Sequence, residues 1–158
     1  MKSSRRFCIA GIAMAELMVA IGLFGITSAA AVAALLRINT NAALCRLQTG
    51  ACTVAQNQID LILSDGPFNP QPALNQVPPE LTLGETDQGS AAAPTIAVYT
   101  DPSTGQKVLG WMQTVVKDAG ASSGGTALYV YQVTVTVSYY YKGRLYSVSL
   151  NTMRASDT

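Results

Sequence analysis

The stretch GIAMAELMVAIGLFGI, residues 11–26, decides the fold. It opens an apolar run that continues to Leu36, and Glu16 is the sole charged residue in that run. About 25 residues of α-helix rise roughly 37 Å, enough to cross a hydrocarbon core of about 30 Å. A carboxylate inside such a helix costs about 3 kcal/mol on insertion scales, so its presence usually has a functional reason. The sequence therefore predicts a membrane-spanning helix with a functional glutamate near its start.

Length and charge limit the remaining possibilities. The chain has 158 residues, which suits one domain of ordinary size beside the membrane segment. Charged residues make up 12% of the chain and the formal net charge is +1, so we expect no nucleic-acid partner. Three basic residues precede the apolar run, Lys2, Arg5 and Arg6. This positive start predicts a single-pass membrane protein with its soluble domain outside the cytoplasm.

The residue types give no support for catalysis. The chain contains no histidine, the commonest general base and metal ligand, so we expect a protein that is not an enzyme and has no cofactor and no metal site. The three cysteines, Cys8, Cys45 and Cys52, lack any zinc-site spacing. They allow at most one disulfide.

The pattern beyond Arg37 predicts that the helix continues. Apolar residues recur there at helical spacing between polar ones until SDGPFNPQP, residues 64–72, ends the helix. We expect one helix of about fifty residues, half in lipid and half on a soluble domain. Residues 68–94 are rich in Pro, Gly and Ser and are predicted to form an irregular loop.

The C-terminal half alternates apolar and polar residues, as strands do. TIAVYT (95–100) and KVLGWMQTVVK (107–117) flank a turn sequence and are predicted to pair. After a flexible break, GASSGG, a longer hairpin is predicted from ALYVYQVTVTVSYYY (127–141) and LYSVSLNTM (145–153). The predicted fold is therefore α+β, with a long N-terminal helix packed on a small antiparallel sheet.

This order of segments resembles the type IV pilin and pseudopilin superfamily. Its members begin with a short basic leader, a glycine, a hydrophobic residue and, five residues after the glycine, a glutamate. Gly11, Ile12 and Glu16 match that pattern, although phenylalanine is more usual than isoleucine after the glycine. The C-terminal strand pair looks more like minor pilins and minor pseudopilins. The resemblance implies a leader at 1–11, a transmembrane and assembly helix at 12–38, and a soluble pilin-like domain at 39–158.

The resemblance also implies roles for these residues. Prepilin peptidase would cut between Gly11 and Ile12 and methylate the new amino group of Ile12. Glu16 would neutralise the amino terminus of a neighbouring subunit as subunits pack into a type IV pilus or a type II secretion pseudopilus. The expected partners are therefore the peptidase, other pilin or pseudopilin subunits and the inner membrane. A buried carboxylate and a buried amino terminus each need such a partner.

Several alternatives stay open. The N-terminus could be a secretory signal peptide, since SAAAVAA (28–34) offers small residues at cleavage-site spacing, or a plain anchor for a binding protein or adhesin. A disulfide between Cys45 and Cys52 requires a break near Gly50, because on an unbroken helix the two lie about 10 Å apart. Otherwise they pack as small apolar residues. Six tyrosines are expected to be cross-strand packing partners rather than a binding surface: Tyr129, Tyr131, Tyr139, Tyr140, Tyr141 and Tyr146. The acidic loop residues Glu85, Asp87 and Asp101 are expected to be solvated rather than calcium ligands.

Overall fold

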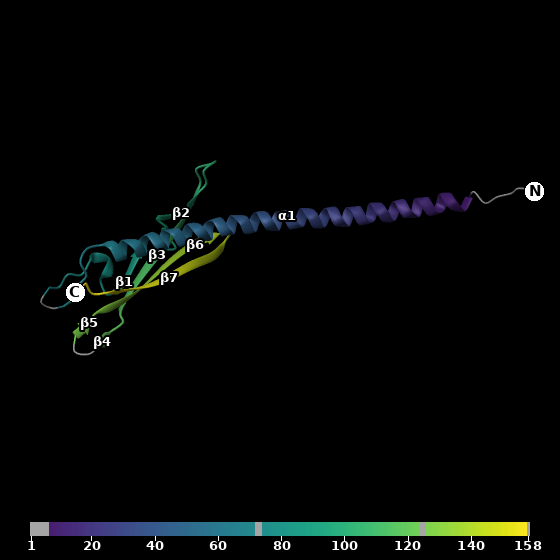
Figure 1. Ribbon diagram of the computed structural model, residues 1–158. Coiled ribbons are helices and arrows are strands. Elements are labelled where there is room, and N and C mark those ends of the chain that lie inside the picture. The colour runs from purple at the N-terminus through teal and green to yellow at the C-terminus, as the bar shows by residue number, and fades with distance from the viewer. Residues whose placement is uncertain (1–6, 72–73, 124–125, 158) are drawn as a thin grey trace, which may run out of the picture. The chain divides into compact units, whose positions relative to one another are not determined.

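The computed structural model describes residues 7–71, 74–123 and 126–157 (Figure 1). The chain divides into two compact units, one up to Leu44 and one from Cys45 onward. The elements follow in the order α1 (Phe7–Ser64), the short 3-10 helix η1 (Pro79–Leu81), β1 (Gly84–Gln88), β2 (Ile96–Thr100), β3 (Lys107–Asp118), β4 (Ala121–Ser123), β5 (Thr126–Leu128), β6 (Val130–Tyr141) and β7 (Arg144–Ala155). The predicted α+β class is confirmed.

Helix α1 is 58 residues long, somewhat longer than the fifty expected, because it begins at Phe7 inside the proposed leader. It ends where the sequence predicts. The Asp65 amide still donates to the Leu61 carbonyl at 2.9 Å, and Gly66 then adopts a positive φ of 45°. Pro67 follows directly, and a proline there cannot continue the helix.

The main sheet is antiparallel and has five strands. β1 and β2 both pair with β3, which pairs with β6, and β6 pairs with β7. Both predicted hairpins are present. In the β6–β7 hairpin, the two turn residues Lys142 and Gly143 have φ angles of 50° and 74°, as a tight type I′ turn requires.

Two predicted irregular segments contain regular structure. The segment 68–94 includes η1 and β1, and β1 pairs in register with β3 from Gly84 opposite Val116 to Gln88 opposite Met112. The prediction of a flexible break at GASSGG is also wrong in part, because β4 pairs with β5 on either side of residues 124–125. β5 and β6 divide what the alternation predicted as one strand. Short strands rich in Gly, Ser and Asp lack the apolar alternation that would reveal them.

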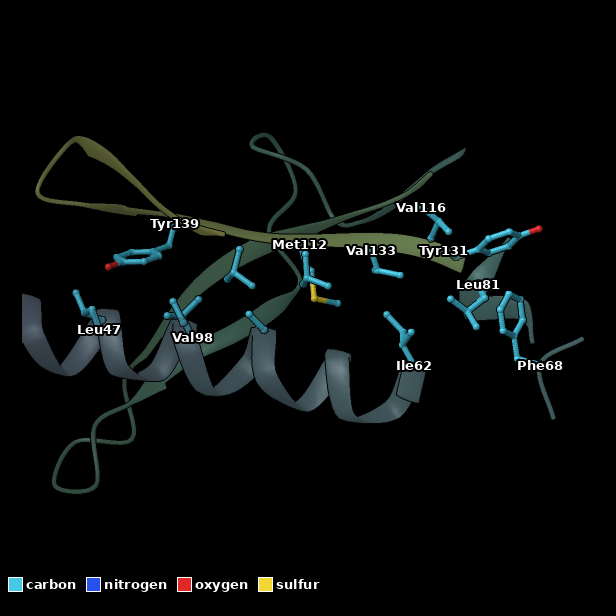
Figure 2. Packing of buried hydrophobic residues seen from close by; sticks show 14 residues of the cluster. Leu47, Ile62, Phe68, Leu81, Val98, Met112, Val116, Tyr131, Val133 and Tyr139 are labelled. Carbon is cyan, nitrogen blue, oxygen red and sulfur yellow. The ribbon is translucent and has the colours of Figure 1, made fainter. Parts of the chain in front are cut away.

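The core lies between the last five turns of α1 and one face of the sheet, and the side chains of the two layers point toward each other (Figure 2). Alternate residues of β6 are buried on this face, as the period of a strand requires. The helix contributes Leu47, Ala51, Ala55 and Ile62, and the sheet contributes chiefly Val98, Met112, Val116, Tyr131, Val133, Val135, Val137 and Tyr139. Phe68 and Leu81 close the core at the end of the helix.

Gly50 determines how closely the helix approaches the sheet. A Cβ atom at this position would collide with the backbone carbonyl oxygen of Val98 in β2. Only glycine therefore allows this contact. Gly110 on β3 has a similar role, because a Cβ there would meet the Ser138 carbonyl oxygen.

Candidate functional site

The N-terminal unit presents an exposed apolar helix surface. From Met14 to Ile38 every large apolar side chain is exposed, by 58% to 74%. These side chains are Met14, Leu17, Met18, Val19, Ile21, Leu23, Phe24, Ile26, Val32, Leu35, Leu36 and Ile38. The helix is long and apolar enough to span a membrane. Exposed apolar surface of this extent requires lipid or other helices around it.

Glu16 lies within this apolar surface. It is exposed on α1, and no other charged residue occurs between Phe7 and Leu36. Helix geometry places it five residues, or about 7.5 Å, beyond Gly11 along the axis. Gly11 and Ile12 belong to α1, but the surroundings of their side chains lie outside the described part of the chain, as do leader residues 1–6. The cleavage, methylation and assembly roles of these residues stay predictions.

The cysteine pair does not form a bridge. Cys45 and Cys52 are both free thiols, and α1 continues through Gly50 without the break that a disulfide would need. The packing alternative holds only for Cys52, which is partly buried, because Cys45 is exposed. Gly50 does not break the helix; it allows the close contact between α1 and the backbone of Val98.

Arg154 connects the last strand to the end of α1. Its guanidinium donates from Nη1 to the carbonyl oxygens of Ile62 at 2.6 Å and Asp65 at 2.8 Å, and from Nη2 to Gly66 at 2.6 Å. These carbonyls have lost their helical partners at the C-terminus, where a cation is also favoured by the helix dipole. Arg154 is 8% exposed, and water competes little for its buried bond to Ile62, whereas its bonds to Asp65 and Gly66 are only part-buried. We call this arrangement the Arg154 clamp.

Asp157 and Phe68 complete the clamp. One Asp157 carboxylate oxygen accepts from the Phe68 amide at 2.8 Å and lies 3.4 Å from Arg154 Nη2. The Asp157 amide donates in turn to the Phe68 carbonyl at 2.7 Å. The hydrogen bond from the Phe68 amide is the main reason that the pKa of Asp157 lies below its ordinary value. Desolvation opposes this shift, and the charge and hydrogen bond of Arg154 make smaller contributions that lower the pKa. The guanidinium carbon also lies 5.6 Å from the centre of the Phe68 ring. The chain after the helix is therefore held against the C-terminal segment.

The acidic loop residues gather no metal site among the described residues. Asp101 accepts hydrogen bonds from the Ser103 amide and hydroxyl and from the Thr104 hydroxyl, within its own turn. These bonds, that of the Ser103 hydroxyl above all, lower the pKa of Asp101 to about 2. Glu85 instead accepts from the Gln113 side-chain amide on the neighbouring strand. Both carboxylates thus organise turns and strands.

The tyrosines mostly act as packing residues, as predicted. Tyr139 is buried and stacks on its cross-strand partner Tyr146, with ring centres 5.8 Å apart. Tyr131 is buried against Phe68 at 4.8 Å. Burial raises the pKa of both Tyr131 and Tyr139. Of the described tyrosines, Tyr140 alone is exposed, on the opposite face, where it contacts Trp111.

Comparisons of the chain with protein-family models, with curated proteins and with solved structures give no match in any of the three. The architecture is nevertheless pilin-like, with a long apolar N-terminal helix whose last turns pack on an antiparallel sheet. Functional assignment rests on the chain's own residues.

Proposed function

We propose that this chain is a minor pilin or pseudopilin, a subunit without enzymatic activity that assembles through its N-terminal helix into a type IV pilus or a type II secretion pseudopilus. The observation that carries the proposal is Glu16 within an exposed apolar helix surface. A tethered domain needs an apolar helix but has no use for a carboxylate inside it. A helix that packs beside copies of itself has a use for both.

In this proposal prepilin peptidase removes residues 1–11 and methylates the amino group of Ile12. The basic leader stays on the cytoplasmic side of the inner membrane and the sheet domain lies outside the cytoplasm. Cleavage turns the Ile12 nitrogen into a cation within a low-dielectric surrounding. Glu16 of one subunit then pairs with the amino group of the next, so neither charge stays buried alone.

The strength of this pair predicts a large effect on assembly. Removal of one partner of a buried ion pair costs about 3 to 5 kcal/mol, which weakens an association constant by roughly two to four powers of ten. Membrane insertion should not suffer, because an uncharged residue enters lipid more easily than glutamate.

The test introduces Glu16→Leu in the native host, with Glu85→Gln as the matched control at a carboxylate on the sheet. We expect both variants to be cleaved and inserted, and only Glu16→Leu to be missing from sheared filaments and from crosslinks to other subunits. Incorporation of Glu16→Leu at the wild-type level would refute the assembly role. A membrane-anchored binding protein would then be the better assignment.

Cleavage has a separate test at Gly11. A bulky substitution there should leave uncut precursor, because the peptidase must approach the backbone closely at this position. An N-terminus at Ile12 in the mass spectrum of a Gly11→Trp variant would refute the requirement for glycine, whereas a mature wild-type protein that begins at another residue would place the processing site elsewhere.

A further inference from the structure

The sheet has one end that lies where α1 joins the C-terminal unit. Leu47 of α1 and Tyr139 of β6 lie at this end of the core, and Ile62 lies toward the other end (Figure 2). Tyr139 pairs with Gly110 of β3 and with Tyr146 of β7, so the three long strands all reach this end. We call it the Tyr139 end.

The Tyr139 end is positively charged. Four exposed basic residues lie there: Arg46 on α1, Lys107 at the start of β3, Lys142 in the β6–β7 turn and Arg144 at the start of β7. Asp101 also lies at this end, in the turn after β2, but its carboxylate accepts three hydrogen bonds within that turn. Other acidic residues lie at the opposite end, where Asp65, Asp118 and Asp157 stand at the ends of α1, β3 and β7. The two ends of the sheet therefore carry opposite charge.

A small apolar patch lies beside these cations, on the sheet face that points away from α1. We call it the Trp111 patch, and its members are Leu109, Trp111, Tyr140 and Leu145. They share a face because side chains alternate along a strand and the neighbouring Gly110 and Tyr139 are buried against α1. Tyr140 pairs with Leu145 of β7, and its ring centre lies 5.6 Å from that of Trp111.

The length of the chain keeps the Tyr139 end close to any membrane that α1 spans. Only eight residues, 37–44, separate the apolar run from the C-terminal unit. They rise about 12 Å as α-helix. The apolar run of about 37 Å exceeds a hydrocarbon core of about 30 Å, and such an excess is commonly taken up by tilt. Tilt lowers one side of an attached domain toward the bilayer, and interfacial Trp, Tyr, Lys and Arg side chains determine which side.

We propose that the Tyr139 end rests on the surface of the bilayer that α1 spans, with its basic residues on anionic phospholipid headgroups. The rings of Trp111 and Tyr140 suit this depth, because each has an apolar body and one polar group. Lys142 and Arg144 flank the patch from the β6–β7 turn. The contact holds a free subunit in one orientation. It rests on the membrane insertion in the proposed function but requires no filament.

The test uses the full-length chain in vesicles of equal parts phosphatidylcholine and phosphatidylglycerol. Trp111 is the sole tryptophan, so Trp111→Phe gives a background in which one new tryptophan reports one position. Leu145→Trp reports on the patch. Met153→Trp is the matched control, because it lies on the same strand and face, is similarly exposed, and is about 27 Å further along β7. Phosphatidylcholine brominated on its acyl chains quenches tryptophan only at short range.

We expect brominated lipid to quench the emission of Leu145→Trp and to leave that of Met153→Trp unchanged. Adding Lys142→Asn with Arg144→Gln should lower the ratio of docked to undocked protein roughly thirtyfold, since each basic residue at an anionic surface contributes about 1 kcal/mol. Asparagine tolerates the positive φ at position 142. Lys117→Gln, near the opposite end of β3, should leave the quenching intact.

Quenching at both tryptophan positions, or at neither, would overturn the proposal, and so would quenching that persists without Lys142 and Arg144. If aqueous acrylamide cannot reach the tryptophan of Leu145→Trp and brominated lipid does not quench it, a second copy of the chain covers the patch and the proposal is wrong. Adding Glu16→Leu should leave the lipid quenching unchanged. This contact and filament assembly can therefore fail independently of one another.

Discussion

Replacement of Arg154 by methionine should destabilise the protein more than any exposed substitution, because the side chain holds three carbonyl oxygens at once. Hydrogen bonds from a charged donor contribute about 1.5 to 3 kcal/mol each. Water can replace the guanidinium at Asp65 and Gly66, whose bonds are part-buried, but reaches the buried bond at Ile62 poorly. The sum of three bonds therefore overstates the loss. We expect Arg154→Met to lower the free energy of unfolding by about 3 kcal/mol, which lowers Tm by about 10 °C for a domain of this size.

The assay is thermal or denaturant unfolding of the full-length chain in detergent, followed by the near-ultraviolet signal of the sheet aromatics. Arg144→Met is the control, since Arg144 begins the same strand but is exposed, and it should change stability by less than about 0.5 kcal/mol. Arg154→Lys should recover only part of the loss, because an ammonium cannot match the fork of a guanidinium. If Arg154→Met lowers the free energy of unfolding by less than about 1 kcal/mol, the hydrogen bonds of the Arg154 clamp add little beyond the packing of the aliphatic part of the arginine side chain.

Three other predictions concern different parts of the molecule. Folding lowers the pKa of the Asp157 carboxyl, so the ionised carboxylate stabilises the fold at pH values above its ordinary pKa of 3.8, and this stabilisation is lost as pH falls through the lower folded pKa. The difference in unfolding midpoint between wild type and Asp157→Asn should therefore be constant near neutral pH and vanish in acid. Gly50→Ala should cost about 1 to 3 kcal/mol in denaturant unfolding through collision with the Val98 carbonyl, whereas Gly25→Ala, with open space around it, should not destabilise the fold. Loss of Lys2, Arg5 and Arg6 leaves seven basic residues against nine acidic ones, so the cleaved protein should show no tight, salt-sensitive binding to duplex DNA in a mobility-shift assay.

The long helix and the two hairpins could be predicted because their signals are local. An uninterrupted apolar run, the Gly66–Pro67 stop and the alternation of β6 and β7 each depend on residues close together in the chain. β1 was not predicted, because the reason that it forms a strand is not local. Its residues are all exposed, and it is a strand only because β3 offers an edge at that point.

Gly50 shows why a local observation can leave two structural interpretations open. A glycine weakens a helix, so the sequence allowed a break with a disulfide as well as an unbroken helix with two packed cysteines. The structure puts that glycine where the Val98 carbonyl approaches α1, a contact between residues almost fifty positions apart. The stability lost within the helix is offset by closer packing against the sheet.

Arg154 is the residue that sequence reasoning missed most completely. In the alternation of β7 it stands where an apolar residue would face the core, and a lone arginine near a C-terminus gives no sign of a partner. Its partners are backbone carbonyls at the end of α1, about ninety residues earlier, and backbone atoms carry no sequence signature. One signal was present: α1 has no basic residue in its last turn to satisfy those carbonyls. The last carbonyls of a helix that lacks its own terminal cation are open to a cation from elsewhere in the fold, and the arginine at a core-facing position of the last strand donates to them here.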